Sequence, residues 1–567
     1  MKNSAGQSWR RVARSIDPWL AAILLAAALF CLRGMGWGRV EDWNRDQMAM
    51  RDLDGLRPTF FQKPPFDTYL NHFVVLLPVQ AAETITERFT GTKQEWNHVR
   101  LMGSRLLVLL LFLGTIVFGY VISLRFFGLL AARVSALFLG TSAGFVVSAH
   151  FLSCDSPLLF FLFASLFFAQ RIVQRGKTRD YVWAGLLVGL TTATKYNGLA
   201  AGILIPLAHW LSPNCTSFRR AFFDWRVILG VALVPIGFLM GNPYAVIESK
   251  RFLADFMYNY EVTPVYGGQH GYGYGLFLRQ FSEILGWPGT IVLWVLVLAS
   301  LALVANPRWR RRERVAGFLL MASFFVLYYL KIGAFARLPS RFVLPVVPFV
   351  ILMAGPFLAQ MEARRRWLYA LLAPVICYNA ICSAMVGQRF ASDPRLAAQT
   401  WLLQHNARGK IIESSPRSPR WSKLETLNLV ELKVGDPNLT NVRPGRGVDL
   451  RMPSVTGRSE LFGRILKGNR WIEAERLAEG EPNEQVFTEA ALLERHPDFV
   501  TVYAPDLKMP TSVAQKYYAQ LLAERFPYSV RFDQDLPAVS RFFYPRKIDF
   551  LDGRISILER RRATSGN

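Results

Sequence analysis

The sequence predicts an α-helical membrane protein with many transmembrane helices, followed by a soluble α/β domain of under two hundred residues. Of the 567 residues, 52% are hydrophobic, and they are gathered in runs such as 106–120 and 227–240 that contain no charged residue. A bilayer span needs roughly 20 mostly apolar residues, and several of these runs reach that length with their flanks. From about Phe390 onward, charged residues, prolines and asparagines return every few positions, as in a water-soluble fold.

The apolar pattern predicts about eleven spans, of which the fifth and sixth are short. They lie near residues 17–38, 101–124, 127–149, 156–173, 181–195, 197–211, 226–245, 285–305, 314–331, 341–360 and 366–387. We therefore expect a transmembrane domain at 1–388, with a long outward loop at 39–100, and a soluble domain at 389–567.

The formal net charge of +25 is concentrated in clusters between these spans. The clusters are Arg171–Arg179, Arg219–Arg226, Arg308–Arg314 and Arg364–Arg366. Cytoplasmic loops of membrane proteins carry an excess of Lys and Arg, so the clusters place the N-terminus in the cytoplasm. An odd number of spans then places the C-terminal domain on the outer side of the cell membrane, that is, the plasma or inner membrane. No nucleic-acid-binding motif is visible, so we expect no nucleic-acid partner.

Several shorter elements are also predicted. The apolar segment Phe66–Pro78 in the first outward loop is too short to span and is typical of an interfacial or buried helix. In the soluble domain, Arg395–His405 and Ser512–Glu524 resemble helices, and Lys410–Glu413 and Phe499–Tyr503 resemble buried strands.

Charged residues at the outer ends of the predicted spans are the candidate functional residues. A charge near the membrane is expensive to bury unless it has a partner or a task. The outward set comprises the acidic residues Asp42, Asp46 and Asp155 and the basic residues His150, Lys63, Lys195, Arg337 and Arg341. Cations at headgroup depth can stabilise a phosphate, and a carboxylate can accept a proton from a hydroxyl group. The mixture fits a reaction between an anionic lipid and a hydroxyl or amine acceptor.

Each of these residues also has a plain structural explanation. Asp155 can cap a helix N-terminus, and Lys195 can extend its ammonium group to the membrane surface. Arg341 can be an interfacial anchor, Lys63 a loop lysine, and His150 a capping or interface histidine. The sequence leaves these alternatives open.

Five short motifs together resemble a known superfamily. They are Lys-Pro-Pro-aromatic at 63–66, Asp-x-Pro-Leu at 155–158, a Gly-Leu-x-x-Gly-Leu run leading into Thr-Lys at 185–195, Arg-aromatic-x-Leu-Pro-x-x-Pro at 341–348, and the start of the soluble domain at 393–406. Their order and spacing resemble the membrane-embedded glycosyltransferases of the GT-C superfamily. The similar branch holds the protein O-mannosyltransferases and the bacterial lipid A aminoarabinose transferases.

The resemblance implies transfer of a sugar from a polyprenyl-phosphate carrier to a lipid, glycan or protein acceptor at the outer face of the membrane. It implies that an acidic residue of the first outward loop acts as the base. Asp46 fits that position better than Asp42, but both alignments remain open because the Asp-Glu pair frequent in that branch is absent. Lys63, Lys195 and Arg341 would meet the carrier phosphate, and no cofactor is expected besides the lipid-linked donor.

The glycine- and tyrosine-rich segment 265–275 contains Tyr266, His270 and Tyr272. It fits a mobile loop over the site, with aromatic rings against sugar or lipid, and it fits a plain flexible loop equally well. His270 has no second ligand in view, and the five cysteines have no metal-ligand spacing, so we predict no catalytic metal.

Two other functions compete with a glycosyltransferase. A transporter or flippase for a lipid-linked or anionic substrate would tend to show internal repeats and ionisable residues at mid-membrane, whereas here the charges lie at outer ends. A non-catalytic scaffold would tolerate neutralisation of Asp46. The sequence leaves the sugar, the acceptor, the role of the soluble domain and the oligomeric state open.

Overall fold

The computed structural model describes most of the chain. The described residues are 17–38, 53, 54, 56–58, 61–92, 96–213, 215, 217–265, 273–309, 311–405, 407, 410–414, 426–428, 487–503, 512–544, 546, 548, 551 and 553–561. The chain forms two compact units. Unit 1 comprises Met1–Met35 and Asp46–Gln388, and unit 2 comprises Gly36–Arg45 and Arg389–Asn567.

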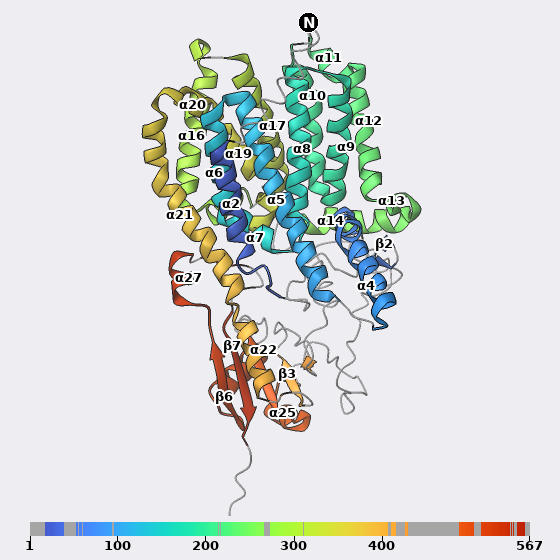
Figure 1. The fold of residues 1–567 in the computed structure, drawn as a ribbon, viewed down its shortest axis with the longest axis vertical. Helices are drawn as coiled ribbons and strands as arrows, with labels where there is room; N and C mark the ends of the chain where they lie inside the picture. The colour runs from blue at the N-terminus through green and yellow to red at the C-terminus, as the bar shows by residue number, and fades with distance from the viewer. Residues whose placement is uncertain are drawn as a thin grey trace, which may run out of the picture. The chain divides into compact units, whose positions relative to one another are not determined.

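Unit 1 is a helical bundle (Figure 1). Its N-terminal half contains α2 (Pro18–Leu32), β1 (Leu53–Asp54), β2 (Arg57–Pro58), α3 (Phe66–Asn71), η1 (His72–Leu76), α4 (Leu77–Thr90), α5 (Asn97–Phe127), α6 (Leu129–Thr141), α7 (Ala143–His150), α8 (Asp155–Gln174) and α9 (Thr178–Thr194). It continues with η2 (Tyr196–Ile203), α10 (Leu204–Leu211), α11 (Phe218–Phe223), α12 (Trp225–Gly241), α13 (Tyr244–Ile247), α14 (Ser249–Val265), α15 (Tyr274–Leu285), α16 (Trp287–Ala305) and η3 (Pro307–Trp309). Its last elements are α17 (Arg312–Ile332), α18 (Ser340–Val343), α19 (Val347–Met353), α20 (Gly355–Gln360), η4 (Glu362–Arg364) and α21 (Arg365–Ala391), the last of which runs into unit 2.

All eleven predicted spans fold largely as helix, which confirms a helical multi-pass membrane protein. By length and composition, five helices of the described part can cross a membrane, or six if the bent pair α6 and α7 forms one span. The helices α2 and α12 and the segment Val347–Gln360 are apolar but shorter. The number eleven therefore stays a prediction.

Two helical segments differ from the predicted bounds because of proline. The expected span 341–360 is divided into α18, α19 and α20, since Pro345, Pro348 and Pro356 each remove a backbone donor that a continuous helix needs. The expected helix Phe66–Pro78 instead continues through η1 and α4 to Thr90. Pro78 does not end it because it lies in the first turn of α4, directly after the π-helical turn η1.

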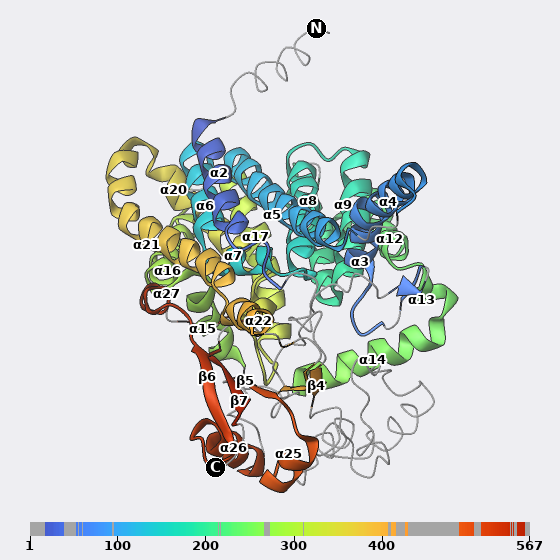
Figure 2. The same ribbon diagram turned by 60° about the horizontal axis from the view of Figure 1, so that its bottom comes forward.

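The helices α8, α9, α10 and α12 run side by side in the bundle (Figure 1). Glycines allow α9 and α12 to approach closely: a Cβ atom at Gly185, Gly189 or Gly237 would overlap backbone atoms of the facing helix. Spacing small residues four apart on one helix face is the usual way to bring two membrane helices into backbone contact. By contrast, α14 lies across the end of the bundle (Figure 2).

Unit 2 contains a five-stranded sheet with the order β4-β3-β5-β7-β6. The strands are β3 (Ile412–Ser414), β4 (Thr426–Asn428), β5 (Phe499–Tyr503), β6 (Tyr528–Gln534) and β7 (Ile555–Arg560), and the helices are α22 (Pro394–Gln404), α25 (Glu489–Arg495), α26 (Ser512–Leu522) and α27 (Ala538–Phe543). The strands β3, β4 and β5 are parallel, whereas β7 is antiparallel to both β5 and β6. All four predicted elements of this domain are present, with shifts of one or two residues at some ends.

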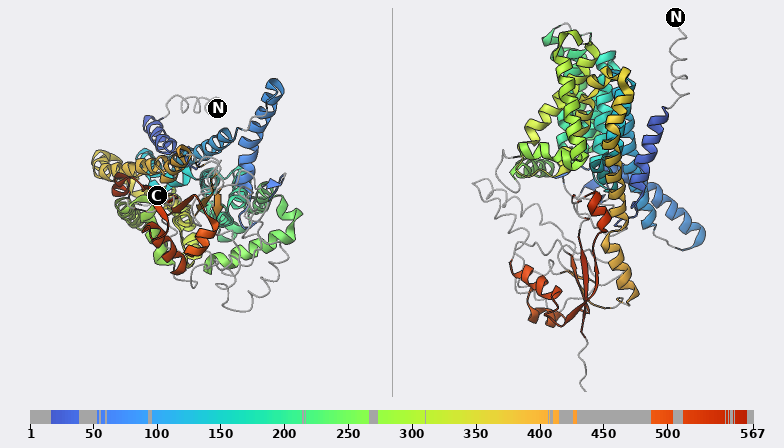
Figure 3. Two further views of the ribbon diagram at one scale, coloured as in Figure 1. Left: turned by 90° about the horizontal axis from the view of Figure 1, so that it is seen from below. Right: turned by 90° about the vertical axis from the view of Figure 1, so that its left-hand side faces the viewer.

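Helices cover both faces of this sheet (Figure 3). Successive side chains of a strand point to opposite faces, and β5 has five consecutive buried residues. Val500 and Val502 pack with Leu492 and Tyr518 from α25 and α26, while Phe499 and Tyr503 pack on the other face in the core that includes α22. The mostly apolar run Phe499–Tyr503 is therefore explained by a strand that is buried on both faces.

Candidate functional site

The ion pair between Asp155 and Lys195 forms the centre of the candidate site. Asp155 is the first residue of α8, and Lys195 directly follows the last residue of α9. These helices are neighbours of similar length joined by a short loop, so the start of one lies beside the end of the other. The Lys195 Nζ donates to Asp155 Oδ1 at 3.0 Å, and the Ser153 hydroxyl lies 3.2 Å from the other carboxylate oxygen.

This geometry differs from the two structural explanations, which are helix capping by Asp155 and extension of the Lys195 ammonium group to the membrane surface. The N-cap residue of α8 is Cys154, and the Asp155 side chain makes no capping hydrogen bond, although its charge favours the first turn of the helix. The ammonium group of Lys195 turns to a carboxylate, and its side chain is only 19% exposed. Each charge is thus held by the other at the same end of the bundle.

Lys63 lies in the same charged neighbourhood, although the sequence separates it from Asp155 by 92 positions. The thiol of Cys154 interacts electrostatically with Asp155, Lys195, Asp67 and Lys63. Four charged side chains from three separate segments therefore lie near the start of α8, and two of them, Asp155 and Lys195, are in direct contact.

The segment that precedes Lys63 is fixed by hydrogen bonds from two directions. The Tyr196 hydroxyl, next to Lys195, donates to the Phe61 carbonyl at 2.5 Å, and the Phe61 N–H donates to Asp255 Oδ2 of α14 at 2.8 Å. The Asn259 side chain donates to the Gln62 carbonyl at 3.1 Å. The crossing helix α14 therefore positions the backbone that carries Lys63.

Asp67 is a member of this cluster that the sequence analysis missed. It lies in the first turn of α3 and is only 8% exposed. Burial raises the pKa of Asp67 to about 7; backbone N–H groups and Lys63 lower the pKa, and the nearby Asp155 raises it further. A carboxyl group with that pKa exchanges its proton near neutral pH. The signal for Asp67 in the sequence is an aspartate four residues after Lys63, within the apolar segment Phe66–Pro78 that predicts only a helix.

Arg341 approaches the cluster through an aromatic ring. The Lys195 Nζ lies 5.2 Å from the centroid of the Phe342 ring, and the Arg341 guanidinium carbon lies 5.8 Å from the same centroid. The Phe342 carbonyl accepts a hydrogen bond from Tyr328 of α17 at 2.8 Å, which holds α18 in place. Lys195 and Arg341 therefore both lie near this ring.

The other described candidates are less closely connected to the ion pair. Arg337 is exposed, four residues before Arg341. His150 is 2% exposed, and its two ring nitrogens each lie 2.8 Å from a backbone carbonyl, those of Val146 and Arg33. These contacts favour a structural role for His150, since they join α7 to the end of α2.

Five candidates lie outside the described residues. They are Asp42, Asp46, Tyr266, His270 and Tyr272. Within the described ranges, no group of three or more His, Cys, Asp or Glu side chains could hold a metal ion. Because His270 and the two first-loop aspartates are not among them, the expectation of no metal stays a prediction.

Comparison with known proteins adds a family match to this geometry. The sequence model of the family described as dolichyl-phosphate-mannose-protein mannosyltransferase matches residues 97–239, which include both Asp155 and Lys195. The resemblance to the GT-C glycosyltransferases is thereby confirmed. The match covers α5 to α12. No curated protein sequence matches the chain.

Two solved structures are similar to this chain at low sequence identity. ArnT from Cupriavidus metallidurans, bound to undecaprenyl phosphate, is 14% identical over 98% of this chain and 100% of its own, with a TM-score of 0.48. The oligosaccharyltransferase of Archaeoglobus fulgidus with a tethered acceptor peptide is 12% identical over 96% of this chain and 89% of its own, with a TM-score of 0.45.

Proposed function

We propose that this protein transfers a sugar from a polyprenyl-phosphate-linked donor to a lipid, glycan or protein acceptor at the outer face of the cell membrane. The observation that carries the proposal is the convergence of Lys63, Asp67, Asp155 and Lys195 at one end of the bundle, within and beside the segment that matches the mannosyltransferase family. Buried carboxylates beside cations at headgroup depth suit a reaction in which an anionic phosphate leaves.

In the proposed reaction, an acceptor oxygen or nitrogen attacks the anomeric carbon of the donor sugar. The bond between that carbon and the phosphate oxygen breaks, and the carrier phosphate leaves with the bonding electrons. Lys63, Lys195 and Arg341 stabilise the developing negative charge, while the acceptor proton passes to a first-loop carboxylate. We assign that base to Asp46, with Asp42 as the alternative.

We also propose that the N-terminus lies in the cytoplasm and the C-terminal domain outside. The reaction is proposed to need no cofactor besides the lipid-linked donor. The basic loops at 171–179 and 308–314, at the opposite end of the bundle from Asp155, support this orientation. Loss of transfer in membranes treated with a chelator would contradict the cofactor part of the proposal.

The test is sugar transfer in membranes from a labelled polyprenyl-phosphate donor pool, with variants at matched expression. We expect Asp46→Asn and Lys63→Gln each to reduce transfer by about a hundredfold or more, because each removes a group from the proposed reaction. Loss with Asp42→Asn alone would move the base to Asp42. Full transfer by both aspartate variants would overturn the base assignment.

A matched control lies on the same two helices. Arg171 and Asp180 form an ion pair at 2.8 Å at the far ends of α8 and α9, so Asp180→Asn breaks a comparable contact away from the site. If wild-type membranes transfer no sugar from any donor tested but move a lipid-linked substrate across the bilayer, the protein is a flippase instead.

A further inference from the structure

The short helix α27 of unit 2 has an exposed apolar face. Val539, Phe542 and Phe543 are 62%, 80% and 39% exposed, and the two phenylalanine ring centroids are 5.1 Å apart. Their spacing of three and four residues places them on one side of the helix, whereas Ser540 and Tyr544 are buried on the other side. A contiguous apolar patch of this kind marks a contact with a membrane or with another protein.

The membrane boundary at the C-terminal end of α21 is marked by charge. This helix belongs to the segment Glu362–Gln404, which is long and apolar enough to cross a membrane. Residues 367–388 carry no charged side chain, and Arg366 and Arg389 are the charges on either side. The 27 residues of α21 extend over about 40 Å, which matches the roughly 40–45 Å of a bilayer with its headgroup regions. Arg389 therefore lies at the membrane surface.

Arg389 is bonded directly to α27, and all the residues involved belong to unit 2. Its side chain is buried, and it donates to the Arg546 carbonyl at 2.7 Å, to the Ser540 carbonyl at 3.2 Å and also to the Tyr544 carbonyl. A basic side chain that satisfies carbonyl groups at a helix C-terminus stabilises that end of the helix. The bonds hold α27 beside the last turn of α21, as two views show (Figures 1 and 3).

Basic residues flank the apolar face. Arg541 lies on α27 itself, where it pairs with Asp535, and the sequence continues with Pro-Arg-Lys at 545–547. The guanidinium carbon of Arg546 lies 5.6 Å from the centroid of the Tyr544 ring. Basic side chains next to an apolar helix face are typical of helices that lie on a membrane, because anionic headgroups attract them. This charge favours a lipid surface over a protein partner.

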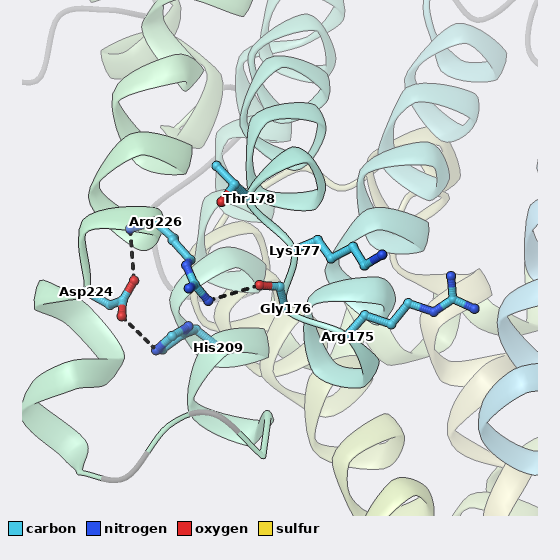
Figure 4. Close-up of a pocket in the computed structure, with 7 residues that line it drawn as sticks. All are labelled: Arg175, Gly176, Lys177, Thr178, His209, Asp224 and Arg226. Carbon is cyan, nitrogen blue, oxygen red and sulfur yellow. Dashed lines mark hydrogen bonds and ion pairs between the residues drawn. The ribbon is translucent and has the colours of Figure 1, made fainter. Parts of the chain in front are cut away.

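The cations at the junction of α8 and α9 are arranged differently. Arg226 donates to the Gly176 carbonyl at 3.2 Å on one side of the loop 175–177, whereas the Arg175 and Lys177 side chains extend to the other side (Figure 4). These cations do not surround one ligand, so the face of α27 is the better-defined contact surface.

We propose that α27 is a membrane contact of the soluble unit. Val539, Phe542 and Phe543 insert into the headgroup region of the leaflet at the C-terminal end of α21, and Arg546 lies at the depth of the lipid phosphates. The soluble unit then has two attachments to the bilayer, which are the span α21 and the apolar face of α27.

The first experiment places a photo-crosslinking side chain at the centre of the apolar face. p-Benzoylphenylalanine replaces Phe542 in the full-length protein, which is irradiated in nanodiscs of phosphatidylcholine and phosphatidylglycerol before its mass is measured. We expect a lipid adduct at residue 542. The matched control carries the same side chain at Leu493 of α25, which is also exposed, and should give none. The proposal is overturned by a crosslinked dimer in place of the lipid adduct, by no adduct at residue 542, or by equal lipid adducts at both positions.

A second experiment separates exposure in the folded chain from insertion into the membrane. Phe542→Cys and Leu493→Cys are each treated with a membrane-impermeant maleimide, and labelling of each site is followed by peptide mass spectrometry. Phe542 is 80% exposed and Leu493 is 36% exposed, so residue 542 should react faster if α27 lies in water. In nanodiscs we expect Phe542→Cys to react on the order of tenfold more slowly than Leu493→Cys, because its thiol lies in the headgroup region. An equal or faster reaction at residue 542 would overturn the proposal.

Discussion

Asp67 is a buried carboxyl group with a pKa of about 7, close to Lys63 and Asp155. Its ordinary pKa of about 3.8 in the unfolded chain is lower, so the folded protein binds this proton more tightly. The stabilisation that protonated Asp67 gives is complete below pH 3.8 and is lost as the pH rises toward 7. At neutral pH the group is poised to hold or release a proton beside the ion pair.

We therefore predict a pH-dependent stability that disappears in Asp67→Asn. The free energy of unfolding of the wild type should fall relative to that of the variant between about pH 4 and 7, by up to about 4 kcal/mol. The measurement is the thermal unfolding midpoint of the purified protein in detergent across that range. Parallel curves for the two proteins would show that Asp67 keeps an ordinary pKa.

The Asp155–Lys195 ion pair predicts that Asp155→Asn lowers both the KM for the donor and kcat. In Asp155→Asn, the Lys195 ammonium group loses its carboxylate partner and becomes fully available to the donor phosphate. We expect the KM for the lipid-linked donor to fall several-fold, because the competing anion is gone, while kcat falls by roughly 10–100-fold as Lys195 and the acceptor lose their orientation. Steady-state kinetics with purified enzyme would show both changes; a rise in KM would contradict the prediction.

At the scale of elements, the contact between α9 and α12 determines where Lys195 lies. Gly185 and Gly189 of α9 face Gly230, Val234 and Gly237 of α12 at distances that leave no room for a Cβ atom. The glycine run that precedes Lys195 in the sequence is therefore a packing surface. Because Lys195 follows the end of α9, separation of these helices would move its ammonium group away from Asp155.

We predict that Gly189→Val destabilises the protein by about 3 kcal/mol or more and reduces sugar transfer, since the side chain must displace the backbone of α12. The matched control is Gly202→Ala in η2, where an added Cβ would meet nothing within 4 Å and should leave both properties nearly unchanged. Thermal unfolding and transfer assays on both variants test this. A fully stable, active Gly189→Val protein would show that the two helices are not tightly packed.

At the scale of the whole molecule, unit 2 includes a residue from the start of the chain. Trp37 is 1% exposed, and its indole N–H donates to Asp393 Oδ2 at 2.6 Å. Asp393 also pairs with the buried Arg395, whose guanidinium carbon lies 5.5 Å from the Trp37 ring centroid. Trp37, five residues after the end of α2, thus belongs to a buried polar network with Asp393 and Arg395 at the start of α22.

We predict that Trp37→Ala lowers the stability of unit 2 by about 3–5 kcal/mol, because it removes a large buried ring and leaves Asp393 without one donor. Limited proteolysis of the full-length protein should cleave within 389–567 at lower temperature than in wild type. Trp367→Ala, at an 80% exposed tryptophan of α21, is the control and should leave the cleavage unchanged. Identical protection of both variants would exclude this role for Trp37.

Individual elements were predictable from the sequence because their signals are local. Apolar runs predicted the helices of unit 1, and the strand Phe499–Tyr503 was predicted to the residue. The errors have local causes as well: Pro78 suggested a helix end, but at the first turn of α4 it is compatible with a helix that continues to Thr90.

The sequence by itself determined the multi-pass helical fold, the α/β unit, and the candidate residues Lys63, Asp155, Lys195 and Arg341, because hydrophobic length and short motifs can be read along the chain. Only the tertiary structure decided that Lys195 pairs with Asp155, that α14 fixes the Lys63 segment, and that Asp67 joins them. These contacts depend on the lengths and packing of distant helices. The pKa of Asp67 depends on how many neighbours bury it, which no local stretch of sequence specifies.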